Sequence, residues 1–203
     1  MYKIKDFSYF FQKTDHKYNF QEYVELFNVE SRHIYLNSLT PQNADSINKI
    51  IQMWNKKDEK DSLNFAERVP IKIFINSSGG DFNAMLTLMD IIRLSKTPIE
   101  TINMGICYRE AFFVFLAGHK RYAYPKSSFM FEKDLKHLEE ANEKMPENYM
   151  NFYNKQLNEL KDILLERTKV TESEYNKHLK NPWWITADES QKLKICNEIF
   201  YNF

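Results

Sequence analysis

Two uninterrupted hydrophobic runs dominate the middle of the chain. Residues 71–75 are almost wholly apolar, as expected of a strand that is covered on both faces of a sheet. Residues 111–117 are apolar on every side, which predicts a buried helix ended by Gly118 at the C′ position. Between these runs the pattern predicts a helix over about 82–95 and a strand over 99–105. Strands that alternate with helices predict an α/β domain.

The flanking segments continue the alternation. Thr40 as N-cap and Pro41 at the first helical position open a helix whose apolar residues recur at helical spacing as far as Trp54. The charged stretch 55–68 predicts a solvated loop, and residues 119–121 predict a basic turn. The other expected elements are strands over 32–36, 122–124, 128–131 and 195–200, a long helical pattern over 135–167 interrupted near Pro146, and a helix over about 186–193.

The chain divides by composition into a short arm and one domain. Residues 1–30 are rich in aromatic side chains without a clean period, so we interpret residues 1–31 as an N-terminal arm that packs on the body or on a neighbouring subunit. With 203 residues, of which 43% are hydrophobic, the chain can bury a substantial core. Residues 32–203 are therefore expected to form a single domain.

Charge and cysteine content narrow the function classes. The 28 acidic and 28 basic residues balance, which gives no electrostatic reason to expect a nucleic-acid partner. No run of 18 apolar residues is present, so a membrane span is not expected, and the N-terminus lacks a signal-peptide hydrophobic region. Two cysteines make no disulfide framework and suit a reducing compartment. We expect a cytoplasmic protein with neither a cofactor nor a metal.

Glycine is scarce, and its positions are informative. The four glycines are Gly79, Gly80, Gly105 and Gly118, all within one 40-residue window, where an average domain of this length would hold roughly 14 along its whole chain. Two follow the apolar strand, the third closes the next strand, and the fourth ends the apolar helix. We expect backbone positions there that do not accept a Cβ, at the functional centre of the fold.

These segments resemble, in order, the motifs of the ClpP family of self-compartmentalising serine proteases, which has the ClpP/crotonase fold. Residues 74–80 (FINSSGG) are similar to the family's strand followed by NSPGG, and residues 101–105 resemble the strand before its nucleophile. Residues 111–118 resemble the helix after the nucleophile, residues 121–127 the KRFxLPNS segment, and residues 185–190 the FLSAxEA helix start. The resemblance implies repeated ββα-type units with a protruding handle helix, in a handle region at about 133–168.

The resemblance also implies that the catalytic triad is lost. The nucleophile position falls on Arg109, the general-base position on Glu132 and the aspartate position on Pro182. A triad needs a nucleophile, a base that takes its proton and a group that orients the base. Arginine stays protonated, and proline has no polar side chain that could orient a base. All three roles would be vacant.

Other residues could stand in for the nucleophile. Cys107 lies two positions before Arg109 and so points to the same side of a strand, although it is more simply a buried structural thiol. The hydroxyls of Ser77, Ser78, Ser127 and Ser128 are further candidates, more simply interpreted as turn or strand groups. The resemblance places no histidine beside Cys107: His119 follows the apolar helix, His137 lies in the long helical segment, and His178 precedes Pro182; Asn181 could orient a base but none is there to orient.

The replaced positions have chemistry of their own. The resemblance places residues 109 and 132 within hydrogen-bonding reach, so we hypothesise that Arg109 and Glu132 form a bidentate ion pair that plugs the former site. The alternative is two independent solvated charges. Gly80 keeps one backbone N–H of the family's oxyanion hole, whereas Glu110 stands where the second oxyanion-hole residue is expected. A carboxylate there would oppose stabilisation of an oxyanion.

Two surfaces depart from the family pattern. Residues 133–140 are charged and free of glycine where the family has a glycine-containing segment that pairs between rings, which puts a conventional double ring in doubt. On the outer surface, one aromatic residue of the family's docking site for its AAA+ unfoldase is replaced by Lys72, while Phe74 is kept.

The leading interpretation is a catalytically inactive ClpP-like subunit, comparable to ClpR-type subunits. It would act through self-association into rings or smaller oligomers, with an active ClpP and a AAA+ unfoldase as candidate partners. One alternative is crotonase-like acid–base chemistry by Glu110 and Glu132, although no basic cluster is convincingly placed for a CoA phosphate. Another is peptide hydrolysis through a relocated nucleophile.

Overall fold

The computed structural model describes residues 20–132 and 147–201 and divides the chain into two units, residues 1–33 and 34–203. In the first unit the described residues form helix α2 (Phe20–Glu30). The sequence pattern predicts no regular element there, but the segment holds neither glycine nor proline, and both are the strongest helix breakers. Val24, Leu26 and Phe27 are exposed on α2. Residues 1–19 of the expected arm lie outside the described residues.

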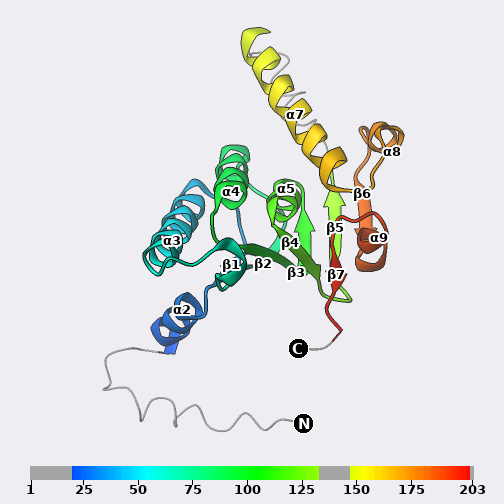
Figure 1. Cartoon of the computed structure of the whole chain (residues 1–203). Helices are drawn as coiled ribbons and strands as arrows, with labels where there is room; N and C mark the ends of the chain where they lie inside the picture. The colour runs from blue at the N-terminus through cyan, green and yellow to red at the C-terminus, as the bar shows by residue number, and fades with distance from the viewer. Residues whose placement is uncertain (1–19, 133–146, 202–203) are drawn as a thin grey trace. The chain divides into compact units, whose positions relative to one another are not determined.

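The second unit is built on a mostly parallel sheet (Figure 1). Its strands run in the order β1-β2-β3-β4-β7, and β5 pairs with β3 and β6. All pairs made by β3 are parallel, whereas β5 and β6 are antiparallel. The strand bounds are β1 His33–Leu36, β2 Ile71–Ser77, β3 Ile99–Tyr108, β4 Lys120–Ala123, β5 Ser128–Phe131, β6 Trp183–Thr186 and β7 Glu198–Ile199.

Strand β3 is the longest strand and changes partner along its length. Residues 100–103 pair with β4, and residues 106–108 pair with β5 on the same side. The buried Asn103 side chain lies at this fork: its Nδ2 donates to Ser128 O (2.8 Å) and its Oδ1 accepts from Gly105 N (3.1 Å). The second pairing carries β3 to Tyr108, beyond the predicted end at Gly105. It also sets the turn after β3 beside β5.

Helices cover one face of the sheet and supply the core (Figure 1). Helix α5 (Glu110–Ala117) is buried along its whole length and packs against α4 (Phe82–Leu94), which packs in turn against α3 (Pro41–Lys60). The largest side chains that are fully buried include Phe112, Phe115 and Phe129. The remaining elements are η1 Phe65–Glu67, α7 Glu147–Arg167, α8 Glu172–Lys177 and α9 Ala187–Lys192. The α/β class predicted from the hydrophobic runs is confirmed.

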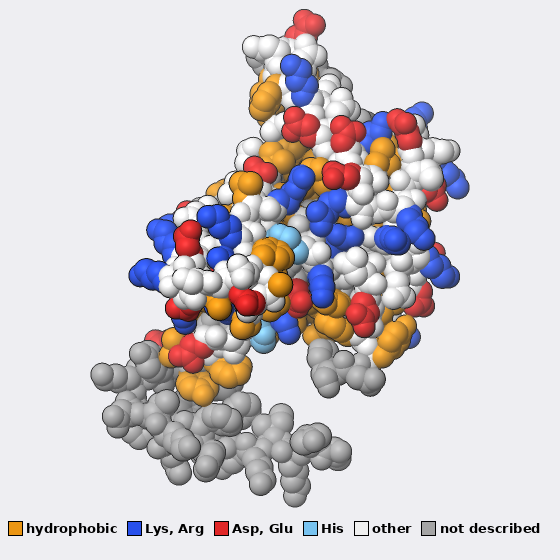
Figure 2. Space-filling view, in the orientation of Figure 1, with side chains coloured by type: hydrophobic (Ala, Val, Ile, Leu, Met, Phe, Trp, Pro, Cys, Tyr) orange, Lys and Arg blue, Asp and Glu red, His pale blue; other side chains and the backbone are white. Residues whose placement is uncertain are grey.

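Helix α7 is the described part of the predicted handle. It projects beyond the sheet and its covering helices, and its projecting part carries hydrophobic as well as charged side chains (Figures 1 and 2). Tyr149 and Phe152 are exposed there. The charged stretch 133–140, His137 and the predicted interruption near Pro146 lie outside the described residues.

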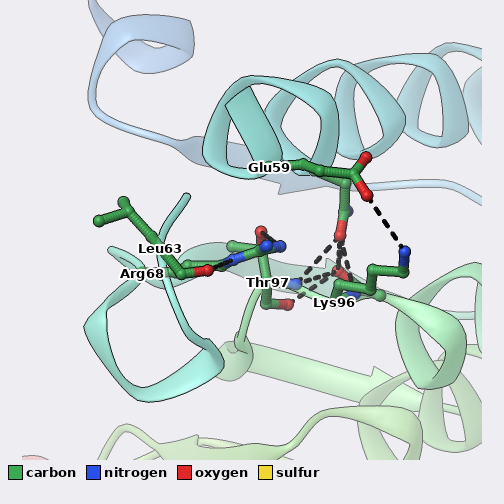
Figure 3. Close-up of polar contacts among 7 residues, drawn as sticks. Glu59, Leu63, Arg68, Lys96 and Thr97 are labelled. Carbon is green, nitrogen blue, oxygen red and sulfur yellow. Dashed lines mark hydrogen bonds and ion pairs between the residues drawn. The ribbon is translucent and has the colours of Figure 1, made fainter. Parts of the chain in front are cut away.

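The predicted solvated loop at 55–68 is partly wrong, because α3 continues to Lys60. The buried Asp58 accepts a hydrogen bond from Thr97 Oγ1 (2.7 Å), and Asn55 Oδ1 accepts from the N–H groups of Lys96 (2.7 Å) and Thr97 (3.0 Å). Figure 3 shows part of this clasp, in which Arg68 also donates to Leu63 O and Thr97. A charged sequence hides these contacts because their partners lie about 40 residues away.

Two predictions for the end of α5 are also wrong. Gly118 is the C-cap, with φ −55° and ψ 141°, and is not a left-handed C′ residue. A Cβ there would lie 2.3 Å from Thr101 Oγ1, so close approach is what requires glycine. Residues 120 and 121 belong to β4 instead of a turn, because the buried Arg121 satisfies its guanidinium on backbone carbonyls.

Candidate functional site

A strained turn joins β3 to α5. Its residue is Arg109, with φ 55° and ψ −120°, a conformation that costs a side-chain-bearing residue about 1–3 kcal/mol. Two bonds hold the turn: Arg109 N donates to Met130 O (2.9 Å), and Phe112 N donates to Arg109 O (3.1 Å). Hydrolases of the α/β class display their nucleophile on this kind of sharp strand-to-helix turn. Here the turn displays a guanidinium that is 42% exposed.

The glycine pair after β2 faces this turn. Gly79 and Gly80 have φ values of 110° and 153°, and a Cβ on Gly80 would lie 2.2 Å from Leu39 O. Leu39 holds the loop through two bonds: Leu39 N donates to Gly79 O (3.3 Å), and Asp81 N donates to Leu39 O (2.9 Å). The expectation that a Cβ cannot be accepted here is confirmed, and the geometry leaves the Gly80 N–H facing the start of α5.

The Glu110 carboxylate receives that N–H. Gly80 N donates to Glu110 Oε2 at 2.9 Å, and Glu110 Oε1 lies 3.8 Å from Arg109 Nη2. The Glu110 side chain is 6% exposed, so its charge is held inside the protein next to the first turn of α5. The partial positive charge at a helix N-terminus favours an anion at this position. The chain therefore places its own carboxylate on the backbone donor of this loop.

Glu132 completes the group on the other side of Arg109. Arg109 Nε lies 3.8 Å from Glu132 Oε2, well beyond the 2.7–2.9 Å typical of a charge-assisted hydrogen bond. The hypothesis of a bidentate pair is therefore wrong: the two charges are near each other in one loose, partly solvated contact, which stabilises the fold by under about 1 kcal/mol. Pro182 immediately precedes β6, and the β5–β6 register continued by one pair sets it opposite Glu132.

A small cavity of about 30 Å³ opens beside these charges. Its walls are mostly apolar and come from α4, α5, β5, α7 and α8, with Lys161 as a further charged residue. The lining residues are Phe82, Met85, Arg109, Glu110, Phe113, Phe131, Glu132, Leu157, Leu160, Lys161 and Tyr175. The arrangement can bind an apolar group whose polar end reaches Arg109.

The stand-in nucleophiles are engaged elsewhere. Cys107 is fully buried, its Sγ donates to Ala111 O (3.3 Å), and burial raises the pKa of its thiol well above the ordinary value, so it stays protonated at neutral pH. Ser77 Oγ accepts from Gly79 N (3.2 Å), Ser127 Oγ donates to Tyr124 O (2.8 Å), and Ser128 Oγ bonds to Tyr108 Oη (2.8 Å). Ser78 is exposed in the glycine turn.

The described histidines also have structural contacts. His119 Nδ1 accepts from Ile99 N (3.0 Å), and burial followed by the Arg167 charge lowers the pKa of His119. His178 stacks on Trp183 at 4.3 Å between ring centroids, and burial lowers its pKa as well. Among residues 20–132 and 147–201, no group of three or more His, Cys, Asp or Glu side chains is arranged to hold a metal ion. No described helix is long and apolar enough to cross a membrane.

The residues singled out for the outer surface lie on β2. Phe74 stacks on Tyr35 of β1, with ring centroids 5.1 Å apart, and Lys72 precedes it on the same side of the strand. A second stacked pair, Tyr122 and Phe200, lies 4.5 Å apart at β4 and the end of β7. The sequence analysis does not pick out Tyr35, Tyr122 or Phe200 for this surface. Their alternation with buried neighbours along each strand is the signal that could have found them.

The site thus combines a parallel-sheet fold, a strained turn after a central strand and a glycine loop that faces the turn. Solved structures share the architecture: the ClpP catalytic domain from Plasmodium falciparum matches with a TM-score of 0.69 at 22% identity over 93% of this chain and 95% of that chain. ClpP1 from Listeria monocytogenes matches with a TM-score of 0.69 at 18% identity over 89% of this chain and 97% of that chain. These likenesses define the ClpP fold.

Sequence comparison gives the family. The Clp protease family model matches residues 19–202, so this chain belongs to the Clp protease family. Proteolytic subunit 2 of the ATP-dependent Clp protease from Treponema denticola is 28% identical over 135 residues, 66% of this chain and 67% of the relative. The corresponding subunit 2 from Borreliella burgdorferi is 26% identical over 132 residues, 64% of this chain and 66% of the relative. The aligned region thus spans about two thirds of these relatives.

Proposed function

We propose that this chain is a catalytically inactive subunit of the Clp protease family that acts through assembly instead of hydrolysis. The observation that carries the proposal is the bond from Gly80 N to Glu110 Oε2 (2.9 Å). Peptide hydrolysis needs free donors aimed at the oxygen that becomes negative in the transition state. In this chain the Gly80 donor already holds a carboxylate, whose charge would repel a second anion.

The three proposed triad positions support the same conclusion. Arg109 stays protonated and cannot attack a carbonyl, and Pro182 has no side-chain group that could orient a base. Glu132 contacts Arg109 at 3.8 Å and would be a poor substitute for histidine, because a carboxylate next to a guanidinium has little tendency to take a proton. The strained turn that presents a nucleophile persists without one.

Assembly is supported by surfaces that an isolated subunit leaves uncovered. Members of the family form oligomeric rings that work with AAA+ partners. Val24, Leu26 and Phe27 expose apolar area on α2, and we propose that they contact a neighbouring subunit, either another copy or an active ClpP. The stacked Tyr35 and Phe74 offer an aromatic surface to a AAA+ unfoldase, with Lys72 altering its chemistry.

The enzymatic alternatives have weaker support. For crotonase-like chemistry, Glu110 would have to release Gly80 and reach a substrate from a position where it is 6% exposed. For hydrolysis through Cys107, the thiol would have to lose its proton while buried, although burial raises its pKa.

Native mass spectrometry with a fluorogenic peptide assay in the same samples tests the proposal. The protein is measured alone and mixed with an active ClpP from the same source. We expect homomers without hydrolysis and mixed complexes that retain it. Peptide hydrolysis by the protein alone, at a rate that survives removal of contaminating proteases, would contradict inactivity.

A matched pair of variants tests the assembly surface. Phe27→Asp places a charge on the exposed apolar face of α2, whereas Met53→Asp places one at a similarly exposed hydrophobic residue of α3. We expect Phe27→Asp to lower the fraction of oligomer about tenfold or more and Met53→Asp to leave it unchanged. Equal effects of the two substitutions would contradict the assignment of α2 to assembly.

A further inference from the structure

Arginine side chains gather where three helices end. Arg93 lies in the last turn of α4, and Arg167 is the last residue of α7. Arg167 Nη2 donates to Gly118 O (2.6 Å), at the end of α5. The buried Arg121 donates to Arg167 O (3.0 Å), Lys194 O (3.0 Å) and Ile195 O (2.7 Å). The guanidinium groups therefore reach only backbone carbonyls here.

No carboxylate balances this cluster within the described part of the chain. Among those residues, no Asp or Glu lies within ion-pair distance of Arg93, Arg121 or Arg167, although the exposed Glu166 is close enough to raise the pKa of Arg167 slightly against the other effects. Arg167 Nε is a buried donor with no hydrogen-bond partner. Buried donors of this kind are rare in native proteins and indicate a missing acceptor.

The helix ends do not neutralise the arginines. Each helix C-terminus carries roughly half a negative charge, so the ends of α4, α5 and α7 contribute about −1.5 against the three guanidinium charges. A net positive charge remains. Its effect on neighbours is consistent: burial and then Arg167 lower the pKa of Arg121 to about 10, and burial and then Arg93 lower the pKa of Arg167.

The surroundings limit the size of an anion. Figure 2 shows Lys and Arg side chains gathered around a histidine on the visible face of the molecule. Arg93 also lines a groove of about 430 Å³ between α4 and α7, whose other charged residues are acidic: Asp90, Glu159 and Asp162. An extended polyanion that continued along this groove would meet these carboxylates. A compact anion at the Arg93 end would not.

We propose that Arg93 and Arg167 bind a single phosphate group, free or on a small ligand, at the C-terminal end of α5. A guanidinium fork matches phosphate oxygens, and Arg167 Nε supplies a donor that no described group uses. A phosphate dianion matches the residual charge of the cluster better than a singly charged carboxylate does. This site is separate from the one at Arg109 and does not depend on the proposed function.

Isothermal titration of the full chain with inorganic phosphate, at constant ionic strength and pH, tests the site. We expect saturable binding that Arg93→Ala weakens about tenfold or more, since Arg93 is exposed and its loss should not disturb the fold. Lys60→Ala, which removes an exposed basic residue from the last turn of α3, is the matched control and should bind phosphate as the wild type does. Equal affinities for all three proteins, or no saturable heat, would overturn the proposal.

Further titrations identify the ligand class. Arg167→Lys keeps the charge but removes the Nε donor, so it should weaken phosphate binding as well, and unchanged binding would contradict the role of that donor. Acetate at the same concentration should bind far more weakly than phosphate; equal binding would refute the phosphate assignment. Tripolyphosphate that bound much more tightly than phosphate would contradict the restriction to one group. Titration with glycerol 3-phosphate separates the two sources: tighter binding than phosphate favours a small phosphorylated ligand, and weaker binding favours the free ion.

Discussion

The two ends of helix α5 make opposite use of the same backbone. At its N-terminus the Glu110 carboxylate accepts from Gly80 N and lies near Arg109, so an anion from the chain itself fills the positive end of the helix. At its C-terminus Arg167 caps Gly118 O, and cations gather without an acidic partner among the described residues. The first end has its ligand built in, whereas the second has charge left for an external one. Charge complementarity to one helix thus closes one site and opens another.

Substitution of Glu110 by alanine should break the filled end with the largest effect. The change leaves Gly80 N without its charged acceptor, so we expect the free energy of unfolding to fall by about 2 kcal/mol. Urea denaturation measures this. The control is Glu59→Ala, which removes an exposed pair with Lys96 and should cost under about 1 kcal/mol. A cost for Glu110→Ala no greater than that of the control would show that the buried carboxylate adds no stability.

A comparison of Arg109→Gly with Arg109→Ala isolates the strain at the same end. Both variants lose the guanidinium and its loose ion pairs, and they differ only in the Cβ at φ 55° and ψ −120°. We expect the glycine variant to be more stable than the alanine variant by about 1 kcal/mol, the reverse of the usual order in helices. Denaturant unfolding of the two variants measures the difference. If alanine proved the more stable, the turn would not be strained.

The cationic end should show a smaller effect that depends on pH. Burial and the Arg167 charge lower the pKa of His119 from its ordinary value of 6.5. The unfolded chain therefore binds a proton that the folded chain resists, so stability from His119 is present above pH 6.5 and is lost as the pH falls toward the lowered folded-state pKa.

Urea midpoints at about pH 7.5 and about pH 5.5 check this dependence. The wild type should lose more stability between them than His119→Gln does. His178→Gln leaves His119 in place, so part of the pH dependence should remain in that variant. Equal losses in the wild type and His119→Gln would show that the cationic cluster does not oppose protonation of His119.

Sequence reasoning predicts well where a run of residues has one environment. The strand at 71–75 and the buried helix at 111–117 follow from uninterrupted hydrophobicity, and the need for glycine at Gly80 follows from scarcity elsewhere. These elements position the candidate site, so its place at the turn after β3 was within reach of the sequence.

The contacts that decide the chemistry are not local. The partner of Glu110 is a backbone N–H 30 residues away, and Asp58 and Thr97 are separated by 39 residues. A carboxylate in the sequence looks the same whether it is solvated or buried on a donor. The resemblance to ClpP puts Arg109 and Glu132 near each other, but only the geometry shows that they meet in a loose contact and that Glu110 makes the tighter bond.

The fork in β3 has a mechanical consequence. Strands β4 and β7 depend on residues 100–103, whereas β5 and β6 depend on residues 106–108, and Asn103 lies where the two pairings part. The two leaves of the sheet share only their common stem on this side. Their amide protons should therefore exchange with solvent in two groups, each opening at its own rate, and Asn103→Ala should loosen the leaf that holds Ser128 before the other.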